Sequence, residues 1–251
     1  MCEKSYAKVN IFLKITGLRE NYHELTSRFV RVKNLFDTIE FIPSKEKEFK
    51  ITGNFSCPLE KNTIFKAYTL LKNYKNVEDF FKNHYVKIEK NIPEFAGLGG
   101  GSSNSALFLN MVNKICNLSL SKQELARIGE KIGADVPFFI YEYDSANVSG
   151  IGEIVEEFKE EPLNIEVFTP NIKCNTGKIF QTFRQNFYKK RSKEEALALF
   201  SKSSYDILKS LDIYEANDLL NPALSLNPDL KQYIKEGWFF SGSGSSFFKV
   251  Y

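Results

Sequence analysis

Residues 5–15 alternate between apolar and mostly polar positions, which is the period of a β-strand. One face carries the aliphatic side chains of Val9, Ile11, Leu13 and Ile15. The other face carries Lys8, Asn10, Phe12 and Lys14. The alternation therefore predicts a half-buried strand on which Lys8 and Asn10 lie side by side on one surface.

Further elements follow from short apolar runs, helical spacing and capping residues. Strands are predicted at 25–42 (two strands, separated at 34–37), 49–52, 85–89, 136–141, 155–158 and 165–168, and on both sides of the Gly/Ser turn within 238–251. Helices are predicted after the N-cap Asn62, after the glycine-rich segment at 97–101, after the capping box Ser121-x-x-Glu124, and from Thr176 through Phe183. Strands and helices mix without a regular strand–helix–strand rhythm, which favours an α+β fold.

The glycine-rich segment at 93–106 reads Pro-Glu-Phe-Ala-Gly-Leu-Gly-Gly-Gly-Ser-Ser-Asn-Ser-Ala. Clustered glycines let the backbone approach a ligand closely, and the helix that follows presents unpaired N–H groups and its positive dipole end. Together they predict an anion site, most often one for phosphate. The alternative is a flexible, solvated Gly/Ser loop, but linkers rarely lie between a rigid proline and a periodic helix.

The sequence does not match three well-known nucleotide-binding motifs. It lacks the Gly-Lys-Ser/Thr ending of a P-loop, and Ser102 stands where the dinucleotide fingerprint needs Gly or Ala. The sequence also contains no His-Arg-Asp and no Asp-Phe-Gly triplet, which excludes a protein kinase as far as motifs can. The segment is therefore predicted to be a phosphate loop of another lineage.

Composition and charge narrow the class of protein. The chain has 251 residues, of which 43% are hydrophobic and 26% charged, and its net charge of +3 does not indicate a polyanionic partner. The four widely spaced cysteines form no Cys-x-x-Cys pair, which argues against zinc and disulfides. No signal-peptide pattern opens the sequence, and no apolar run approaches the length of a membrane span. We expect a cytoplasmic protein without a nucleic-acid or membrane partner, and no obligate protein partner is evident.

Four pieces of sequence, taken in chain order, resemble the GHMP kinases, the superfamily of galactokinase, homoserine, mevalonate and phosphomevalonate kinases. They are Lys8 with Asn10, the glycine-rich segment, Asp135 within Gly-Ala-Asp-Val-Pro, and the closing Gly242-Ser-Gly244. The resemblance covers nearly the whole chain, and Gly-Leu-Gly-Gly-Gly-Ser-Ser-Asn is its most specific part. It implies a two-lobed fold, with an N-terminal lobe like that of ribosomal protein S5 and a ferredoxin-like C-terminal lobe. A polar, glycine-bearing stretch at 147–152 places the boundary between 1–146 and 147–251.

Other motifs resemble one branch of the superfamily. They are Ala7-Lys-Val-Asn-Ile-Phe-Leu13, Tyr22-His-Glu-Leu25, Asn62-Thr-Ile, Gly150-Ile-Gly-Glu153 and Asn217-Asp218. That branch uses ATP to phosphorylate the 2-hydroxyl of a cytidine diphosphate-linked methylerythritol, in the non-mevalonate isoprenoid pathway. The turn before Tyr22 is one residue shorter than usual here, but Asn21 tolerates the left-handed conformation that glycine would supply.

The resemblance implies a role for each matching residue. Lys8 and Asp135 are the expected catalytic pair, with Asp135 as general base and Lys8 keeping that carboxylate ionised. The expected ATP-binding residues are Asn62, Lys90, Pro93, Ala96, Gly97, Leu98, Gly99, Gly100, Gly101, Ser102, Ser103 and Asn104. The expected substrate-binding residues are Asn10, Tyr22, His23, Phe180, Gly242 and Gly244. Mg²⁺ is expected with the ATP phosphates, and the sequence does not identify a carboxylate pair as its ligand.

Some alternatives stay open at the level of sequence. Phe180 is as consistent with core packing as with stacking on the base. The enzyme could be a GHMP kinase for another alcohol, in which case Tyr22 and His23 are structural. A non-catalytic phosphate- or nucleic-acid-binding module is disfavoured by the joint presence of Lys8 and Asp135. The sequence ends one strand beyond the Gly/Ser turn, so the C-terminal lobe is either a short form or is closed differently.

Overall fold

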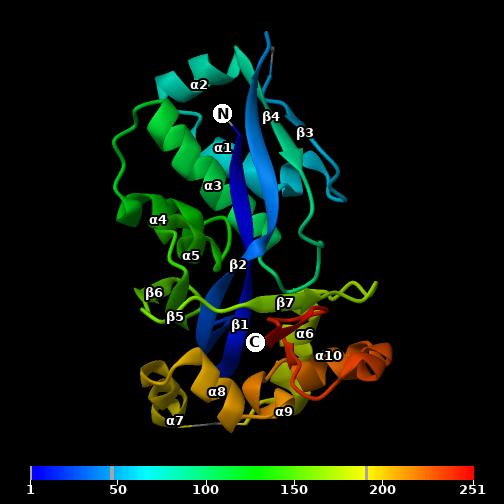
Figure 1. Ribbon diagram of the computed structural model, residues 1–251. Helices are drawn as coiled ribbons and strands as arrows, with labels where there is room; N and C mark the ends of the chain where they lie inside the picture. The colour runs from blue at the N-terminus through cyan, green and yellow to red at the C-terminus, as the bar shows by residue number, and fades with distance from the viewer. Residues whose placement is uncertain (1, 46–47, 190–191) are drawn as a thin grey trace. The chain divides into compact units, whose positions relative to one another are not determined.

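The computed structural model describes residues 2–45, 48–189 and 192–251 (Figure 1). By its contacts the chain forms two compact units. Unit 1 comprises Met1–Ala7, Lys33–Ile92 and Gly100–Glu142, and unit 2 comprises Lys8–Val32, Pro93–Gly99 and Tyr143–Tyr251. The paired strands β1 (Cys2–Arg19) and β2 (Tyr22–Pro43) each contribute residues to both units.

Unit 1 combines a piece of sheet with helices. Within it β2 pairs antiparallel with β4 (His84–Glu89), which pairs parallel with β3 (Ile51–Thr52). Its helices are η1 (Leu59–Lys61), α1 (Thr63–Leu71), α2 (Lys75–Phe81), α3 (Gly100–Ile115), α4 (Lys122–Glu130) and α5 (Val136–Tyr141). Aromatic rings form its core, where Phe41, Phe49 and Phe81 pack edge-on and Phe49 stacks on Tyr68 at 3.8 Å.

Unit 2 contains the remaining parts of β1 and β2, and it also contains a separate sheet. Here β2 pairs antiparallel with β5 (Ser145–Gly150), and β5 pairs with β6 (Ile154–Glu157). The separate antiparallel sheet has the order β7 (Ile165–Phe168), β9 (Phe247–Val250), β8 (Phe239–Phe240). The helical segments are α6 (Thr176–Thr182), η2 (Phe183–Phe187), α7 (Lys193–Leu197), η3 (Ala198–Ser201), α8 (Ser204–Ser210), α9 (Ile213–Ala216), α10 (Leu220–Leu226) and η4 (Pro228–Tyr233).

The capping signals predicted two helix starts correctly. Asn62 accepts a hydrogen bond from the Ile64 backbone at 2.9 Å and begins α1. Ser121 and Glu124 form the reciprocal capping box that begins α4. Both motifs satisfy backbone N–H groups that the first turn of a helix leaves unpaired.

Three predictions about elements were wrong. The stretch 136–141 is the helix α5, because Pro137 suits a first helical turn and a short apolar run does not distinguish a strand from a buried helix. Residues 25–42 belong to one strand without a break at 34–37. The strand at 5–15 is buried on both faces, and its polar side chains are accommodated by hydrogen bonds instead of solvent.

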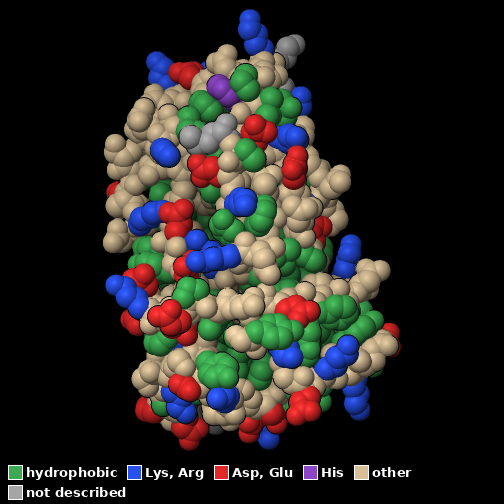
Figure 2. All heavy atoms as spheres, viewed as in Figure 1, with side chains coloured by type: hydrophobic (Ala, Val, Ile, Leu, Met, Phe, Trp, Pro, Cys, Tyr) green, Lys and Arg blue, Asp and Glu red, His purple; other side chains and the backbone are tan. Residues whose placement is uncertain are grey.

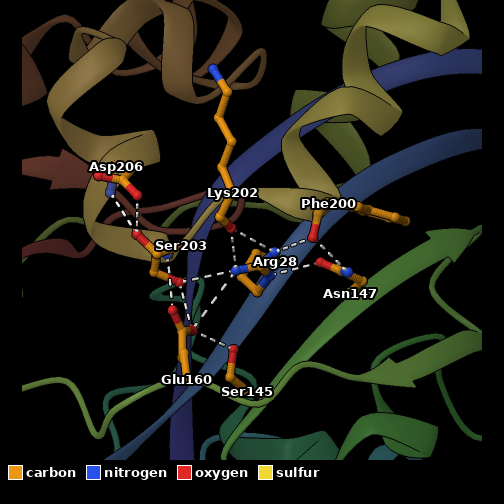
Figure 3. A network of polar contacts seen from close by, with 9 residues as sticks. Arg28, Ser145, Asn147, Glu160, Phe200, Lys202, Ser203 and Asp206 are labelled. Atoms are coloured by element: carbon orange, nitrogen blue, oxygen red, sulfur yellow. Dashed lines mark hydrogen bonds and ion pairs between the residues drawn. The ribbon is translucent and has the colours of Figure 1, made fainter.

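A buried arginine ties the strands of unit 2 to its helices (Figure 3). Arg28 is fully buried and donates to Asn147 at 2.7 Å and to the carbonyl oxygens of Phe200 and Lys202 at 3.0 and 3.2 Å. Glu160 lies 3.8 Å from its guanidinium, and the Phe158 ring lies 3.4 Å from it. Burial lowers the pKa of Arg28 to about 10, so the group stays charged at neutral pH.

The surface carries both signs of charge. Lys and Arg side chains are interspersed with Asp and Glu over the face seen in Figure 2, as the small net charge of +3 leads one to expect. Across residues 2–45, 48–189 and 192–251, no helix has the length and hydropathy to cross a membrane.

Candidate functional site

The first part of the glycine-rich segment lies in unit 2 and packs against the closing Gly/Ser turn. Gly97 has a φ of 75°, and a Cβ on it would lie 2.1 Å from the Ser241 carbonyl oxygen, so only glycine fits. The Ser241 hydroxyl donates to the Gly97 carbonyl at 3.1 Å, and Lys8 N–H donates to the Leu98 carbonyl at 3.0 Å. Ala96 accepts from the Ser246 backbone at 3.1 Å. The segment is therefore held between β1 and the turn that contains Gly242.

The second part of the segment lies in unit 1 and forms the first turn of α3. This helix of 16 residues begins at Gly100 and presents the unpaired N–H groups that suit a phosphate. Ser103 and Asn104 are buried, and the Ser5 hydroxyl lies 2.7 Å from Ser103 Oγ and 2.8 Å from Asn104 Oδ1. Ser5 thus fixes the start of α3, a role that its place in the sequence did not indicate.

Asp135 lies in unit 1, immediately before α5. It occupies the N-cap position, but among the described residues no capping hydrogen bond links its carboxylate to that helix. The preceding Gly133 is close to α3, since a Cβ on it would lie 3.7 Å from Ser102 Oγ. Unit 1 therefore brings the segment that carries Asp135 close to the hydroxyl of Ser102. Capping does not explain why an acid stands at position 135.

Lys8 and Asn10 meet on β1, as the alternation predicted. Lys8 Nζ donates to Asn10 Oδ1 at 2.6 Å, and the ammonium lies 4.6 Å from the centre of the Phe29 ring. The two polar residues are only 3% and 1% exposed. Asn10 Nδ2 donates in turn to the Ser27 hydroxyl at 3.0 Å. A buried ammonium is thus held by an amide and an aromatic face.

His23 and Phe180 meet in unit 2, where an aromatic cluster surrounds the imidazole. The rings of His23 and Phe180 are 5.1 Å apart and tilted by 38°, and Phe183 lies edge-on at 6.0 Å. His23 Nε2 is buried and has no hydrogen-bond partner among the described residues. Burial, and to a smaller degree the charge of Arg184, lower the pKa of His23 below 6.5, which favours neutral imidazole. Tyr22 beside it is 60% exposed.

The Gly242 turn is held in place by an asparagine. Gly242 and Gly244 have φ values of 55° and 83°, which favour glycine. Asn217 Nδ2 donates to the carbonyl oxygens of Phe240 and Gly242, both at 2.9 Å. A Cβ on Gly242 would lie 3.3 Å from Asn10 Oδ1, so the turn runs close to the Lys8–Asn10 pair. The sequence marked Asn217 as part of a motif but gave no sign of this contact.

Asn62 and Lys90 both serve the structure of unit 1. Asn62 caps α1, and Lys90 forms a buried ion pair with Asp37. Asp37 is fully buried and also accepts from the backbone N–H of Asn91 at 2.7 Å and of Ile92 at 2.8 Å. Asp37 thereby shapes the chain that leads to the glycine-rich segment, and sequence reasoning missed it.

The predicted site residues are divided between the two units. Unit 2 joins Lys8, Asn10, Gly97, Leu98 and the Gly242 turn, and separately joins His23 with Phe180. Thr176 of α6, the helix that carries Phe180, bonds to Ser243 of the turn at 2.8 Å. Unit 1 joins the start of α3 to the Asn62 cap through Thr63, whose hydroxyl donates to the Gly101 carbonyl at 2.7 Å.

The described residues contain no group of three or more His, Cys, Asp or Glu side chains placed to hold a metal ion. The donors of the glycine-rich segment are backbone N–H groups and hydroxyls, which suit anions. This chemistry fits a metal that arrives with a phosphate ligand and keeps part of its water.

Comparison with known proteins adds names to this arrangement. Residues 62–143 match the family described as GHMP kinases N terminal domain. The chain is 54% identical to 4-diphosphocytidyl-2-C-methyl-D-erythritol kinase of Sulfurimonas denitrificans, over 98% of this chain and 96% of that protein. It is 48% identical to the enzyme of the same name from a Sulfurovum species, over 98% and 97% of the two chains.

A solved structure gives the same family. A crystal structure of 4-(cytidine 5'-diphospho)-2C-methyl-D-erythritol kinase superposes with a TM-score of 0.75 at 27% identity. The superposition covers 100% of this chain and 90% of that one. The expected two-lobed α+β fold is confirmed.

Proposed function

The chain belongs to the 4-diphosphocytidyl-2-C-methyl-D-erythritol kinases of the GHMP family, and from this we propose that it transfers the γ-phosphoryl group of ATP to the 2-hydroxyl of 4-diphosphocytidyl-2-C-methyl-D-erythritol. This reaction supplies an intermediate of the non-mevalonate route to isoprenoid precursors.

The observation that carries the choice of substrate is the unpartnered imidazole nitrogen of His23. A buried nitrogen without a partner is costly, and a ligand that hydrogen-bonds to it removes the cost. The nitrogen lies among aromatic rings, and the exposed ring of Tyr22 is its neighbour in the chain. A planar base can stack on the rings and can hydrogen-bond to the nitrogen through its polar edge, and cytosine is such a base. Stacking on an aromatic ring adds about 1–3 kcal/mol per base.

ATP binds, in this proposal, with its phosphates at the glycine-rich segment and the start of α3. The backbone N–H groups of 97–101 and the Ser102 and Ser103 hydroxyls are donors of the kind that stabilise a transferring phosphoryl group. The full proposed set is Asn62, Lys90, Pro93, Ala96, Gly97, Leu98, Gly99, Gly100, Gly101, Ser102, Ser103 and Asn104. Asn62 and Lys90 contribute through the shape of the backbone, since both side chains have structural partners.

Proton transfer is assigned to Asp135 and charge neutralisation to Lys8. The substrate hydroxyl must lose its proton as the new P–O bond forms, and an ionised carboxylate is the base for this step. The ammonium of Lys8, oriented by Asn10, neutralises charge that develops on the transferred group. Asn10, Gly242 and Gly244 would hold the substrate beside the Lys8 ammonium, because they lie close to it in unit 2.

Mg²⁺ is proposed as the companion of ATP. When bound, it would supply positive charge that reduces the repulsion between the phosphates and the attacking hydroxyl. It would be held through the ATP phosphates, for which the glycine-rich segment offers backbone N–H groups and hydroxyls.

The organisation of the chain is proposed on the same basis. Residues 1–146 form the ATP-binding lobe, which includes the stretch 62–143 that matches the GHMP N-terminal family, and 147–251 form the lobe on the substrate side.

All four cysteines lie in the described residues and are free thiols, which suits a reducing cytoplasm. We propose small molecules as its only obligatory partners.

The test is a comparison of alcohols. Purified protein is given ATP, Mg²⁺ and, in separate reactions, the cytidine diphosphate substrate, mevalonate or homoserine, and ADP release is followed. We expect kcat/KM for the cytidine compound to exceed the other two by at least about 10³-fold, since several polar contacts distinguish them. A preference for mevalonate or homoserine would make the protein a GHMP kinase for another alcohol.

A further inference from the structure

We propose that Ser27 is a positioning residue of the phosphoryl-transfer site, which fixes the side-chain amide of Asn10 and through it the ammonium of Lys8. The inference rests on the proposed function, because it gives Lys8 a part in catalysis. Nothing in the sequence pattern or in the family resemblance singled out Ser27.

The Ser27 hydroxyl is the middle of a hydrogen-bond chain inside unit 2. It is fully buried on β2 and donates its single proton to the carbonyl oxygen of Phe12 at 2.5 Å. Its oxygen then accepts from Asn10 Nδ2 at 3.0 Å. Asn10 Oδ1 accepts from Lys8 Nζ at 2.6 Å. The chain therefore runs from a charged donor, through an amide and a hydroxyl, to a backbone acceptor.

The backbone carbonyl sets the direction of the whole chain. A carbonyl can only accept, so the Ser27 proton points to Phe12, and the Ser27 oxygen is left to accept. Asn10 must then turn its NH₂ group to Ser27 and its oxygen to Lys8. The reversed amide would set two donors against each other at Lys8 and two acceptors at Ser27. Both ends thus select one orientation of Asn10, and buried groups that lose their partner bear the full cost.

Neighbouring residues on β2 hold Ser27 in its place in the hydrogen-bond chain. On the next position of β2, Arg28 is locked by Asn147, Phe200 and Lys202 in the network of Figure 3. Two positions along β2, Phe29 places its ring 4.6 Å from Lys8 Nζ. Ser27 and Phe29 lie on the same face of β2. Phe29 contacts Lys8 directly, and Ser27 acts on it through Asn10.

The experiment removes the hydroxyl and measures both kinetic constants for ATP and the cytidine diphosphate substrate. Without the Ser27 acceptor the amide of Asn10 can swing away, and Lys8 loses a contact that orients its ammonium. We expect Ser27→Ala to lower kcat about tenfold, because Lys8 acts on the transition state, while the KM for ATP stays within about twofold. Ser27→Cys fills nearly the same space with a weak hydrogen-bonding group and should lower kcat in the same direction.

The adjacent strand position supplies a matched control. Thr26 is also fully buried, and its hydroxyl has no hydrogen-bond partner among the described residues. Thr26→Val deletes one buried hydroxyl with little change of shape and is expected to leave kcat within twofold of the wild type. Circular dichroism and thermal unfolding of all variants establish that each is folded before it is assayed.

A double variant separates positioning from a general loss of packing. If Ser27 acts through Asn10, Ser27→Ala has little further effect on kcat in an Asn10→Ala background. Equal multiplicative losses in both backgrounds, or a kcat for folded Ser27→Ala and Ser27→Cys within twofold of the wild type, would overturn the inference. A wild-type protein that does not phosphorylate the cytidine compound would instead overturn the proposed function.

Discussion

The two histidines of this chain have opposite surroundings. His84, in unit 1, stacks on Phe80 at 4.1 Å and contacts the Phe80 carbonyl through Nδ1 at 3.1 Å. His23 keeps a buried nitrogen without a partner among the described residues. His84 has a hydrogen-bond contact and His23 Nε2 has none, and this contrast supports the proposed role of His23 in binding the base.

His23→Ala should weaken binding of the cytidine diphosphate substrate without weakening binding of ATP. The lost hydrogen bond and ring contact predict a KM for that substrate about tenfold higher, and an unchanged KM for ATP. His84→Ala, which removes the other histidine, should change neither constant. Parallel changes in both KM values for His23→Ala would contradict a role in recognising the base.

The lowered pKa of His23 predicts a pH dependence of stability. Above pH 6.5 the imidazole is neutral in both the folded and the unfolded chain. As the pH falls below 6.5, the unfolded chain binds a proton first, so the free energy of unfolding decreases until the lower folded pKa is passed. Urea unfolding at pH 7.5 and pH 5.5 should therefore show a larger loss for the wild type than for His23→Gln. Equal losses would show that the folded chain does not disfavour the imidazolium.

Asp135→Asn tests the proposed general base. The amide keeps the shape of the carboxylate but cannot accept the proton, so turnover should fall by about 10²–10⁴-fold. ATP affinity, measured by calorimetry, should stay within a few-fold of the wild type. Asp144→Asn changes a surface carboxylate that is 58% exposed and should leave turnover unchanged. Full activity of Asp135→Asn would remove Asp135 from the mechanism.

Within unit 2, the Arg28 network connects strand β2 to the helical segments η3 and α8. Arg28→Met should lower the free energy of unfolding by about 3–5 kcal/mol, because Asn147 and the carbonyl oxygens of Phe200 and Lys202 lose their buried donor and Glu160 loses its cation. Arg31→Met, three positions along the same strand, should cost less, since its partner Asp144 is more than half exposed. Urea unfolding measures both. Similar losses for the two variants would contradict the central place of Arg28.

Local signals predicted the elements that depend on local chemistry. The caps at Asn62 and Ser121 were recognised because a side chain two or three residues from its N–H partner leaves a mark in the sequence. The helix at 136–141 was missed because six apolar residues fit either period. Burial of both faces of β1 was also missed, because the alternation of Lys8 and Asn10 with apolar residues is typical of a strand with one solvent-exposed face.

Long-range polar contacts could not be read from the sequence. Asp37 meets Lys90 across 53 positions of the chain, Asn217 meets Gly242 across 25, and Ser27 meets Asn10 across 17. None of these pairs has a characteristic spacing, and each depends on how the strands and turns pack. The site residues themselves were proposed from motifs, and the structure adds the contacts that orient them.

At the scale of the whole molecule, family membership and composition agree. The chain matches relatives named for the cytidine diphosphate kinase over nearly its full length, and its mixed surface charge suits a small-molecule enzyme better than a nucleic-acid-binding module (Figure 2). In the proposed reaction, recognition of the base, binding of phosphate and transfer of a proton are assigned to segments far apart in the sequence. We propose that these parts serve one reaction at one hydroxyl.

The position of the new phosphate tests that claim most directly. The 2-carbon of a 2-C-methylerythritol carries no hydrogen, so a phosphate on its hydroxyl has no proton on the attached carbon to split its ³¹P signal. After reaction with ATP, a proton-coupled ³¹P spectrum of the product should show one new unsplit phosphomonoester beside the unchanged diphosphate. A monoester signal split into a doublet or triplet, or no new monoester, would contradict the account.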